Sequence, residues 1–301
     1  MRRRIVLAVT ALAVWVTGSA LGTASTPAAQ ALPRFALGKA HPAQAFPVLD
    51  GKKPIFILTL GSDARPGEPI NRERSDSIHI IGINPAKKKA SVLGFPRDSW
   101  VNIPGHGTDK INSAMSSGGP ELTIKTMESL TGIHFDFYVL TSFKGVKEAI
   151  DAVGGVTVNV LTPMHDHFSG ADFDPGPIHM TGAQALSFSR DRHDFSNGDF
   201  TRSENQGRLF LATLAEFRKD FAKDPSVLLT YIGAGMRNVQ TDLSLQEVLK
   251  LGFTASQVRS SGVKNMVVPG RTGFVGDKSV VFISDSAKAM YANMKGDGLI
   301  N

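Results

Sequence analysis

The sequence Pro54-Ile55-Phe56-Ile57-Leu58-Thr59-Leu60-Gly61-Ser62-Asp63 predicts a buried β-strand. Residues 55–60 are apolar except for one threonine, and a continuous apolar run of this length is typical of a strand inside a sheet. Pro54 precedes the run and Gly61 ends it, because both residues interrupt regular structure. Asp63 therefore lies in the loop that directly follows the strand.

Similar apolar segments separated by turn residues continue along the chain. They predict further strands at residues 77–83, 90–95, 135–140, 156–160, 265–268 and 280–283, and helices at residues 120–130, 142–153, 181–188, 202–221 and 244–258. The turn Asn84-Pro85-Ala86-Lys87 predicts that the second and third strands form a hairpin. Strands that alternate with helices predict an α/β fold: a single domain with a central mixed β-sheet and helices on both faces.

The composition is that of an ordinary folded domain, with 42% hydrophobic and 20% charged residues in a chain of 301. The formal charge is +6, but three positive charges belong to Arg2, Arg3 and Arg4, so the remainder of the chain favours anionic partners only weakly. The chain has no cysteine. This excludes disulfides, thiolate metal sites and a cysteine nucleophile.

The first 31 residues have the pattern of a targeting segment. Three arginines precede an apolar stretch at residues 5–16, and Ala29-Gln30-Ala31 fits a signal-peptidase cleavage site. An uncleaved membrane anchor is the alternative, since residues 5–24 are long enough to span a bilayer. Both interpretations place the rest of the chain outside the cytoplasm. Residues 32–53 contain Pro33, Pro42 and Pro47 and predict a linker to the domain at residues 54–301.

Aspartate and arginine cluster where the predicted strands end or begin. Asp63 follows the first strand, Arg74 and Asp76 precede the second, and Arg97 follows Pro96 at the end of the third. Carboxylate pairs hold Mg²⁺ together with substrate phosphates, and arginine forks match phosphate oxygens. These clusters of aspartate and arginine therefore predict a metal-assisted site for a phosphorylated substrate. The alternative to a metal site is that one aspartate is a turn residue and the other pairs with Arg74. The alternative for Arg97 is a salt bridge with Asp98 in place of phosphate binding.

A second group of polar residues lies about a hundred positions further on. Arg190 and Arg192 share a direction if their segment is extended, and Arg202 and Gln206 share a face at the start of a helix. With Asp199, they predict a phosphate clamp at a helix N-terminus; a solvated run of charges is the alternative.

Other motifs carry weaker signals. Lys110, in Asp109-Lys110-Ile111-Asn112, is a possible phosphate or sugar contact or an ordinary loop lysine, and the preceding glycines lack the spacing of a Walker A motif. His165-Asp166-His167 could bind zinc, but a polar loop over residues 163–177 is the favoured interpretation. No Gly-x-Ser-x-Gly elbow is present, which disfavours a serine hydrolase.

Taken together, these motifs resemble those of the LytR-CpsA-Psr family of cell-wall enzymes over roughly residues 54–219. The resemblance is carried by the motifs Leu60-Gly61-Ser62-Asp63, Arg74-Ser75-Asp76, Ile83-Asn84-Pro85, Phe95-Pro96-Arg97-Asp98, Lys110-Ile111-Asn112, Gly154-Gly155-Val156, Arg190-Asp191-Arg192 and Asp199-Phe200-Thr201-Arg202. Two positions depart from the family pattern: Asn205 stands where an arginine is common, and residues 113–116 lack an aromatic side chain.

The resemblance implies an extracytoplasmic phosphotransferase, secreted or anchored to the membrane, with no nucleic-acid partner. Such enzymes transfer a glycopolymer from a polyprenyl-pyrophosphate carrier at the outer membrane surface to a peptidoglycan hydroxyl. By resemblance, a divalent cation, Mg²⁺ or Mn²⁺, is held by Asp63 and Asp76. The pyrophosphate is bound by five arginines: Arg74, Arg97, Arg190, Arg192 and Arg202. Asp199 and Gln206 orient these groups, and Lys110 and Asn112 contact the substrate.

The resemblance also implies an apolar tunnel for the lipid between sheet and helices. Its expected lining is Phe137, Val139, Phe143, Val146, Ile150, Phe210 and Leu214. A hydrolase that uses the same site and a non-catalytic lipid- or glycopolymer-binding protein remain alternatives. The general base is also open: Asp98, Asp191 and Asp199 are all candidates, as is a metal-assisted route without a base.

Overall fold

The structure, a computed structural model, describes residues 35–39, 52–65, 67–236, 239–241 and 245–300. The predicted signal peptide or anchor at residues 1–31 lies outside these ranges. Within them, no helix combines the length and the hydrophobicity that crossing a membrane requires.

The central sheet has seven strands in the order β10-β1-β7-β2-β3-β4-β11. In chain order they are β1 (Phe35–Lys39), β2 (Ile55–Ser62), β3 (Ser75–Asn84), β4 (Lys89–Gly94), β7 (Phe137–Ser142), β10 (Val239–Thr241) and β11 (Val263–Val267). The sheet is mixed, because β2–β3, β3–β4 and β1–β7 are antiparallel while β2–β7, β4–β11 and β1–β10 are parallel. The predicted mixed sheet and the predicted β3–β4 hairpin are both confirmed.

The predicted linker is wrong at residues 35–39, because they form β1 inside the sheet. This strand pairs antiparallel with β7 and parallel with β10. The prolines that suggested a linker flank the strand and do not fall within it, so its backbone N–H groups remain available for pairing. Without β1, the far side of β7 would present unpaired backbone groups.

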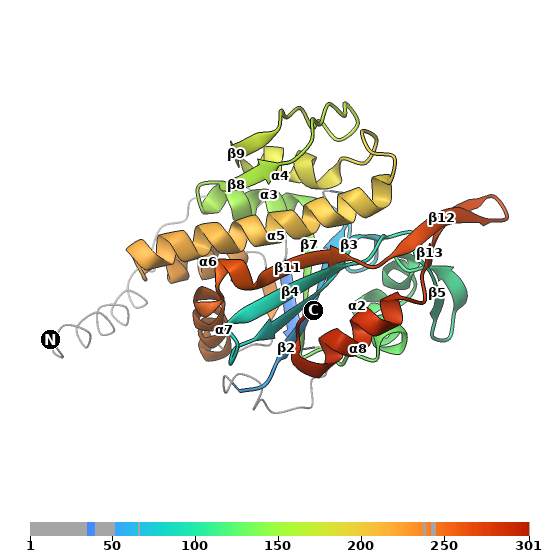
Figure 1. Ribbon diagram of the computed structural model, residues 1–301, viewed down its shortest axis with the longest axis horizontal. Coiled ribbons are helices and arrows are strands. Elements are labelled where there is room, and N and C mark those ends of the chain that lie inside the picture. The colour runs from blue at the N-terminus through green and yellow to red at the C-terminus, as the bar shows by residue number, and fades with distance from the viewer. Residues whose placement is uncertain (1–34, 40–51, 66, 237–238, 242–244, 301) are drawn as a thin grey trace, which may run out of the picture. The chain divides into compact units, whose positions relative to one another are not determined.

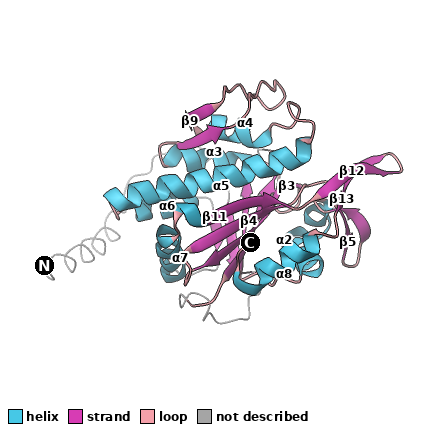
Figure 2. Ribbon diagram, in the orientation of Figure 1, coloured by secondary structure: helices cyan, strands magenta, loops and turns pink. Residues whose placement is uncertain are grey.

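Helices cover both faces of the sheet (Figures 1 and 2), as predicted. One layer contains α3 (Phe143–Ala152), α4 (Gly182–Arg190), α5 (Gly198–Lys223), α6 (Val227–Met236) and α7 (Leu245–Gln257); the other contains α2 (Ser113–Thr131) and α8 (Ala287–Asp297). A large buried cluster joins α2 and α8 to β2, β3 and β4. Separate buried clusters lie under α5 and α7 and between α3, α4 and the hairpin of β8 (Val156–Val160) and β9 (Gly176–Met180).

Three small hairpins lie outside the central sheet: β5–β6 (Trp100–Ile103 and Gly107–Lys110), β8–β9 (Val156–Val160 and Gly176–Met180) and β12–β13 (Gly270–Val275 and Lys278–Ile283). The sequence analysis missed most of their strands, because each is short and half exposed. β9 begins within the segment predicted as a loop. The strand predicted at residues 280–283 exists, but it pairs with β12.

Helix α5 begins at Gly198, one turn earlier than predicted, and is held against the sheet at closely fitted points. A Cβ atom at Gly94 of β4 would come within 2.3 Å of Ser203 Oγ, and one at Gly207 would come within 1.9 Å of Asn265 Oδ1. The amide of Asn265 in β11 donates a hydrogen bond to the Glu204 carbonyl at 2.9 Å. These contacts fix the rotation of α5, and therefore the direction in which its polar side chains point.

Candidate active site

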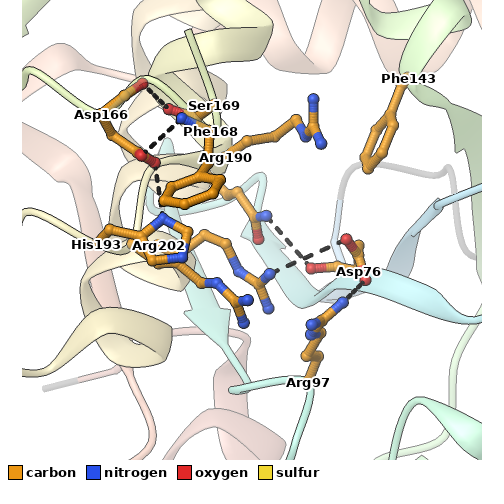
Figure 3. Close-up of a pocket in the computed structure, with 11 residues that line it drawn as sticks. Asp76, Arg97, Phe143, Asp166, Phe168, Ser169, Arg190, His193 and Arg202 are labelled. Carbon is orange, nitrogen blue, oxygen red and sulfur yellow. Dashed lines mark hydrogen bonds and ion pairs between the residues drawn. The ribbon is translucent and has the colours of Figure 1, made fainter. Parts of the chain in front are cut away.

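A pocket of about 360 Å³ lies where β3, the loop after β4, α4 and the start of α5 meet (Figure 3). Six of the predicted site residues line it: Asp76, Arg97, Arg190, Arg192, Arg202 and Gln206. They come from segments up to 130 positions apart in the sequence. The structure therefore unites the two groups of Asp and Arg residues that the sequence analysis singled out.

Asp76 is the centre of the charge network in this pocket. Figure 3 shows the guanidinium groups of Arg97 and Arg202 converging on it. Arg97 Nη1 donates to Asp76 Oδ1, and Arg202 Nη1 lies 4.0 Å from Asp76 Oδ2. Burial lowers the pKa of Arg97, but the Asp76 carboxylate outweighs this and the net pKa is raised. Arg97 thus stays charged at any physiological pH.

Arg202 is 5% exposed, which is unusual for an arginine. Its burial lowers the pKa of the side chain, and the Asp199 carboxylate one turn earlier on α5 opposes this by accepting a hydrogen bond from Nη2. Asp199 also accepts a hydrogen bond from the Asp98 backbone N–H at 3.4 Å. Asp199 therefore fixes the direction of the Arg202 side chain.

Gln206 lies one turn beyond Arg202 on the same face of α5. Its side-chain amide donates to the backbone carbonyl of Asp76 at 3.3 Å, so it ties α5 to β3 beside the pocket. The neighbouring Asn205, the position that departs from the family pattern, is buried and does not line the pocket.

Arg190 and Arg192 are the exposed cations of the pocket. Arg190 is the last residue of α4, so the expected extended segment does not exist there, but both side chains still line the pocket. The Arg190 guanidinium lies 4.7 Å from the centre of the Phe143 ring, a cation–π contact. Neither arginine forms an ion pair within the described residues, which leaves both available for an anionic ligand.

Asp63 lies in the loop after β2, where its N–H donates to the Arg74 carbonyl at 3.1 Å. Burial and the nearby Asp76 carboxylate raise the pKa of Asp63, and Arg97 lowers it less. The two carboxylates therefore repel each other, and a bound cation would relieve this repulsion. The described residues contain no cluster of three or more acidic or histidine ligands. Two carboxylates nonetheless fit Mg²⁺, which keeps several waters and uses substrate phosphates as further ligands.

Five predicted site residues lie outside the pocket lining: Asp63 and Asp199, described above, and Arg74, Lys110 and Asn112. Arg74 is exposed before β3. Lys110 forms an ion pair with Asp98, with Nζ 3.2 Å from Oδ2. Asn112 is 3% exposed; its N–H donates to the Arg97 carbonyl at 3.2 Å and its carbonyl accepts from the Ser75 N–H at 3.5 Å. The observed contacts of Asn112 thus position the backbone beside Arg97 and Asp76.

The pocket also contains residues that the sequence analysis did not assign to it: Phe143, Asp166, Phe168, Ser169 and His193. Asp166 and His193 lie 27 positions apart and are hydrogen-bonded, with His193 Nδ1 3.0 Å from Asp166 Oδ2. Burial raises the pKa of Asp166, but the hydrogen bond with His193 and others outweigh it, and the pKa falls to about 2. His165 pairs with Asp172 instead, so the alternating histidines do not form a zinc site.

A larger apolar cavity of about 550 Å³ adjoins the arginine pocket and lies between the sheet and α3, α5, α6 and α7. Phe143, Arg190 and Gln206 line both spaces. Six of the seven predicted lipid-contacting residues line the cavity. Phe137 does not; it lies on the same face of β7 as Val139 but is fully buried in the core with Ile55 and Ile57.

The model of the LytR_cpsA_psr family matches residues 27–296 of the chain. The chain is 37% identical over 207 residues to a polyisoprenyl-teichoic acid–peptidoglycan teichoic acid transferase TagU of Oceanobacillus iheyensis, a match that covers 66% of this chain and 62% of that protein. A protein of the same name from Enterococcus faecalis is 35% identical over 208 residues, covering 68% and 67%. The match thus spans about two thirds or less of the length of these relatives.

Solved structures show the same fold. Bacillus subtilis TagV superposes with a TM-score of 0.66 at 26% identity, over 82% of this chain and 98% of that chain. Bacillus subtilis TagT gives a TM-score of 0.67 at 23% identity, over 86% and 95%.

Proposed function

The chain belongs to the LytR-CpsA-Psr family, and from this membership we propose that it is an extracytoplasmic phosphotransferase. It moves a glycopolymer from a polyprenyl-pyrophosphate carrier to a hydroxyl group of peptidoglycan, forming a phosphodiester. The names of its relatives, which describe transfer of teichoic acid from a polyisoprenyl carrier to peptidoglycan, support this class of donor and acceptor.

One observation carries the proposal: the cationic pocket and the apolar cavity adjoin each other, and Phe143, Arg190 and Gln206 line both. A polyprenyl pyrophosphate has the same two halves, an anionic head and a long apolar tail. Arginine forks bind phosphate oxygens in pairs, and an apolar cavity favours a hydrocarbon chain by about 25 cal/mol per Å² removed from water. A hydrophilic sugar nucleotide would leave the cavity without a suitable ligand.

The pocket residues suit phosphoryl transfer because this reaction needs alignment and charge neutralisation more than a covalent nucleophile. Arg190 and Arg192, the exposed cations, bind the incoming pyrophosphate oxygens. Arg97 and Arg202, held by Asp76 and Asp199, stay fixed in direction and stabilise the charge that develops on the oxygens during transfer.

We assign Asp63 and Asp76 as the residues that would hold a divalent cation, Mg²⁺ or Mn²⁺. When bound, this ion supplies Lewis-acid neutralisation of the pyrophosphate. Replacing Asp63 with Asn should weaken Mn²⁺ binding about tenfold or more, measured by electron paramagnetic resonance. Asp109→Asn, which alters an exposed carboxylate paired with Lys278, should leave it unchanged. Equal Mn²⁺ affinity in the two variants would contradict the assignment.

The function is tested by incubating the purified protein with a polyprenyl-pyrophosphoryl saccharide, a peptidoglycan oligosaccharide and Mg²⁺. The expected products are the oligosaccharide carrying the sugar phosphate and free polyprenyl phosphate. Release of lipid phosphate without transfer would favour the hydrolase. Tight donor binding without any turnover would overturn the enzyme assignment and favour a binding protein.

We place this reaction outside the cytoplasm, on a carrier at the outer face of the membrane. The proposed substrates support this location, and so do the basic residues and the apolar stretch at positions 2–16, which have the pattern of a targeting segment. Secretion and membrane anchoring both agree with these substrates. Expression of the labelled protein in cells, followed by separation of the membrane and secreted fractions, distinguishes secretion from membrane anchoring.

A further inference from the structure

A second pocket of about 280 Å³ lies on the other side of the α4–α5 loop from the arginine pocket. Its lining comes from the loop after β4, the start of α5 and the β12–β13 hairpin: Asp98, Gly198, Asp199, Thr272, Ser279 and Val281. Arg192 and His193 line both this pocket and the arginine pocket. A group bound in the second pocket is therefore separated from the pyrophosphate only by these two side chains.

The His193 ring is held in one orientation. Its Nδ1 lies 3.0 Å from Oδ2 of Asp166, whose side chain is 1% exposed, and the Asp166 Oδ1 accepts a hydrogen bond from the Phe168 N–H at 2.9 Å. Phe168 packs against the ring, with the centroids 4.7 Å apart (Figure 3). A carboxylate that accepts from Nδ1–H leaves Nε2 as the proton acceptor. The side chain is 43% exposed and lines both pockets, so the ring is open to a ligand bound there.

The three aspartates considered as general base are unsuited to that role. Asp98 is paired with Lys110, and Asp199 with Arg202. A carboxylate that is neutralised by a cation is a weaker base. Asp191 is 0% exposed and cannot reach a substrate. In the described part of the chain, His193 lines both pockets, and its Nε2 is the nitrogen that the contact of Nδ1 with Asp166 leaves as a proton acceptor.

We propose that the second pocket binds the acceptor saccharide and that His193, held by Asp166, is the general base that takes the proton from its hydroxyl. This rests on the proposed function. The acceptor O–H proton moves to His193 Nε2, and the acceptor oxygen forms a bond to the phosphorus that bears the sugar. The bond from this phosphorus to the bridging oxygen breaks, and polyprenyl phosphate leaves with the electron pair. His193 is a catalytic residue in this scheme and Asp166 a positioning residue.

The carboxylates around His193 outnumber the arginines. The carboxylates that line the two pockets are Asp76, Asp98, Asp166 and Asp199. The cations are Arg97, Arg190, Arg192 and Arg202. Asp191 and Asp194 flank the residue on its own loop. Bound pyrophosphate adds negative charge beside the ring, and this charge stabilises the imidazolium that forms when the hydroxyl proton is taken.

The first test is His193→Gln, with the rate of transfer and the affinity for the donor measured separately. The transfer rate should fall about 100-fold or more, the usual contribution of a general base, while the donor Kd changes by less than about threefold. His165→Gln is the matched control, because His165 makes the same kind of pair with Asp172 but lines neither pocket. Added imidazole should restore part of the rate to His193→Ala, which a merely structural role would not allow.

The second test blocks the acceptor pocket. Thr272→Trp should raise the KM for a peptidoglycan oligosaccharide about tenfold or more without changing donor affinity. Arg271→Trp is its control, because successive side chains of a strand point to opposite faces and Arg271 stacks on Phe282.

The outcomes separate the two proposals. If the unaltered protein neither transfers nor hydrolyses the donor, the proposed function fails. If it transfers and His193→Gln retains the full rate, the assignment of the base is overturned. If Thr272→Trp weakens donor binding and leaves the acceptor KM unchanged, the second pocket belongs to the donor site and the acceptor assignment is wrong.

Discussion

At the residue scale, the site depends on arginines whose direction is set by carboxylates. Arg202 is buried and contacts both Asp76 and Asp199, so its guanidinium cannot swing toward solvent. Lysine would keep the charge but present a single ammonium group in place of a planar fork. Arg202 therefore contributes a guanidinium group in a fixed direction as well as a positive charge.

Arg202→Lys should reduce the rate of transfer about 100-fold, in the range found when one preorganised donor to a developing charge is removed. Arg208→Lys is the control, since Arg208 lies on the same helix and pairs with Glu204 at 2.5 Å, outside the arginine pocket. Its rate should stay within about twofold of the unaltered protein. Comparable rates for both variants would show that the fork of Arg202 has no special role.

His79 gives a pH-dependent term in stability. Its Nε2 donates to the Ser203 carbonyl at 3.0 Å, and Nδ1 accepts from the Ser77 hydroxyl at 3.1 Å. Burial lowers the pKa of His79 from 6.5 to about 4, and the hydrogen bond with Ser203 opposes this only in part. Between pH 6.5 and 4, the unfolded chain binds a proton at this residue that the folded chain does not, so stability falls as the pH falls.

The free energy of unfolding that the titration of His79 removes is on the order of 3 kcal/mol, and the loss is complete near pH 4. His79→Gln keeps a donor for the Ser203 carbonyl and removes the titration. The free energy of unfolding, measured with urea from pH 7.5 to 4, should fall more steeply in the unaltered protein than in the variant. Parallel curves would mean that His79 is not held in its neutral form.

At the scale of elements, the placement of α5 against β4 and β11 builds the site. Arg202 and Gln206 reach Asp76 because Ser203 and Gly207, on the neighbouring face, approach the sheet closely. A one-residue rotation of this helix would turn the polar side chains away from β3, since successive residues are 100° apart around the axis.

Gly207→Ala should destabilise the protein by about 1–3 kcal/mol, because the added methyl group would overlap the whole side-chain amide of Asn265. The rate of transfer should fall as well, because the helix carries Arg202 and Gln206. Gly296→Ala in α8 is the control: its Cβ meets open space, and the change should be neutral or stabilise by up to about 1 kcal/mol. Thermal unfolding of both variants measures this, and equal melting temperatures would contradict the packing argument.

The elements also show which parts of the structure the sequence could predict. Strands such as β2 have a continuous apolar run, and Arg202 and Gln206 have helical spacing; both are local signals. β1 has no such signal, because its place between β7 and β10 depends on backbone pairing with strands about 100 and 200 residues away. The pair of Asp166 and His193 joins two irregular loops. Asn112 shows the converse, since its polar side chain suggested a ligand but its backbone ties two segments together.

At the scale of the whole molecule, the apolar cavity that adjoins the arginine pocket extends under the helical layer. Arg190 and Phe143 stand at its polar end, and residues of α6 and α7 such as Ala255 line its far end. Polyprenyl chains of different length would therefore differ in how far they reach toward α7. The length preference of the enzyme is then a property of α6 and α7, separate from the chemistry at Arg97 and Arg202.

Ala255→Trp should shorten the space at its far end and select against long-chain donors. Loss of burial for two or three methylene groups costs about 2 kcal/mol, which corresponds to roughly 30-fold in affinity. The KM for a donor with a long polyprenyl chain should rise accordingly, while a donor with two or three isoprene units, too short to reach α7, should keep its KM and its rate. Ala222→Trp, at an exposed position of α5 that does not line the cavity, controls for the added tryptophan. If Ala255→Trp impaired both donors equally, the tail would not extend along this cavity, and a different apolar ligand would have to explain the cavity beside the arginines.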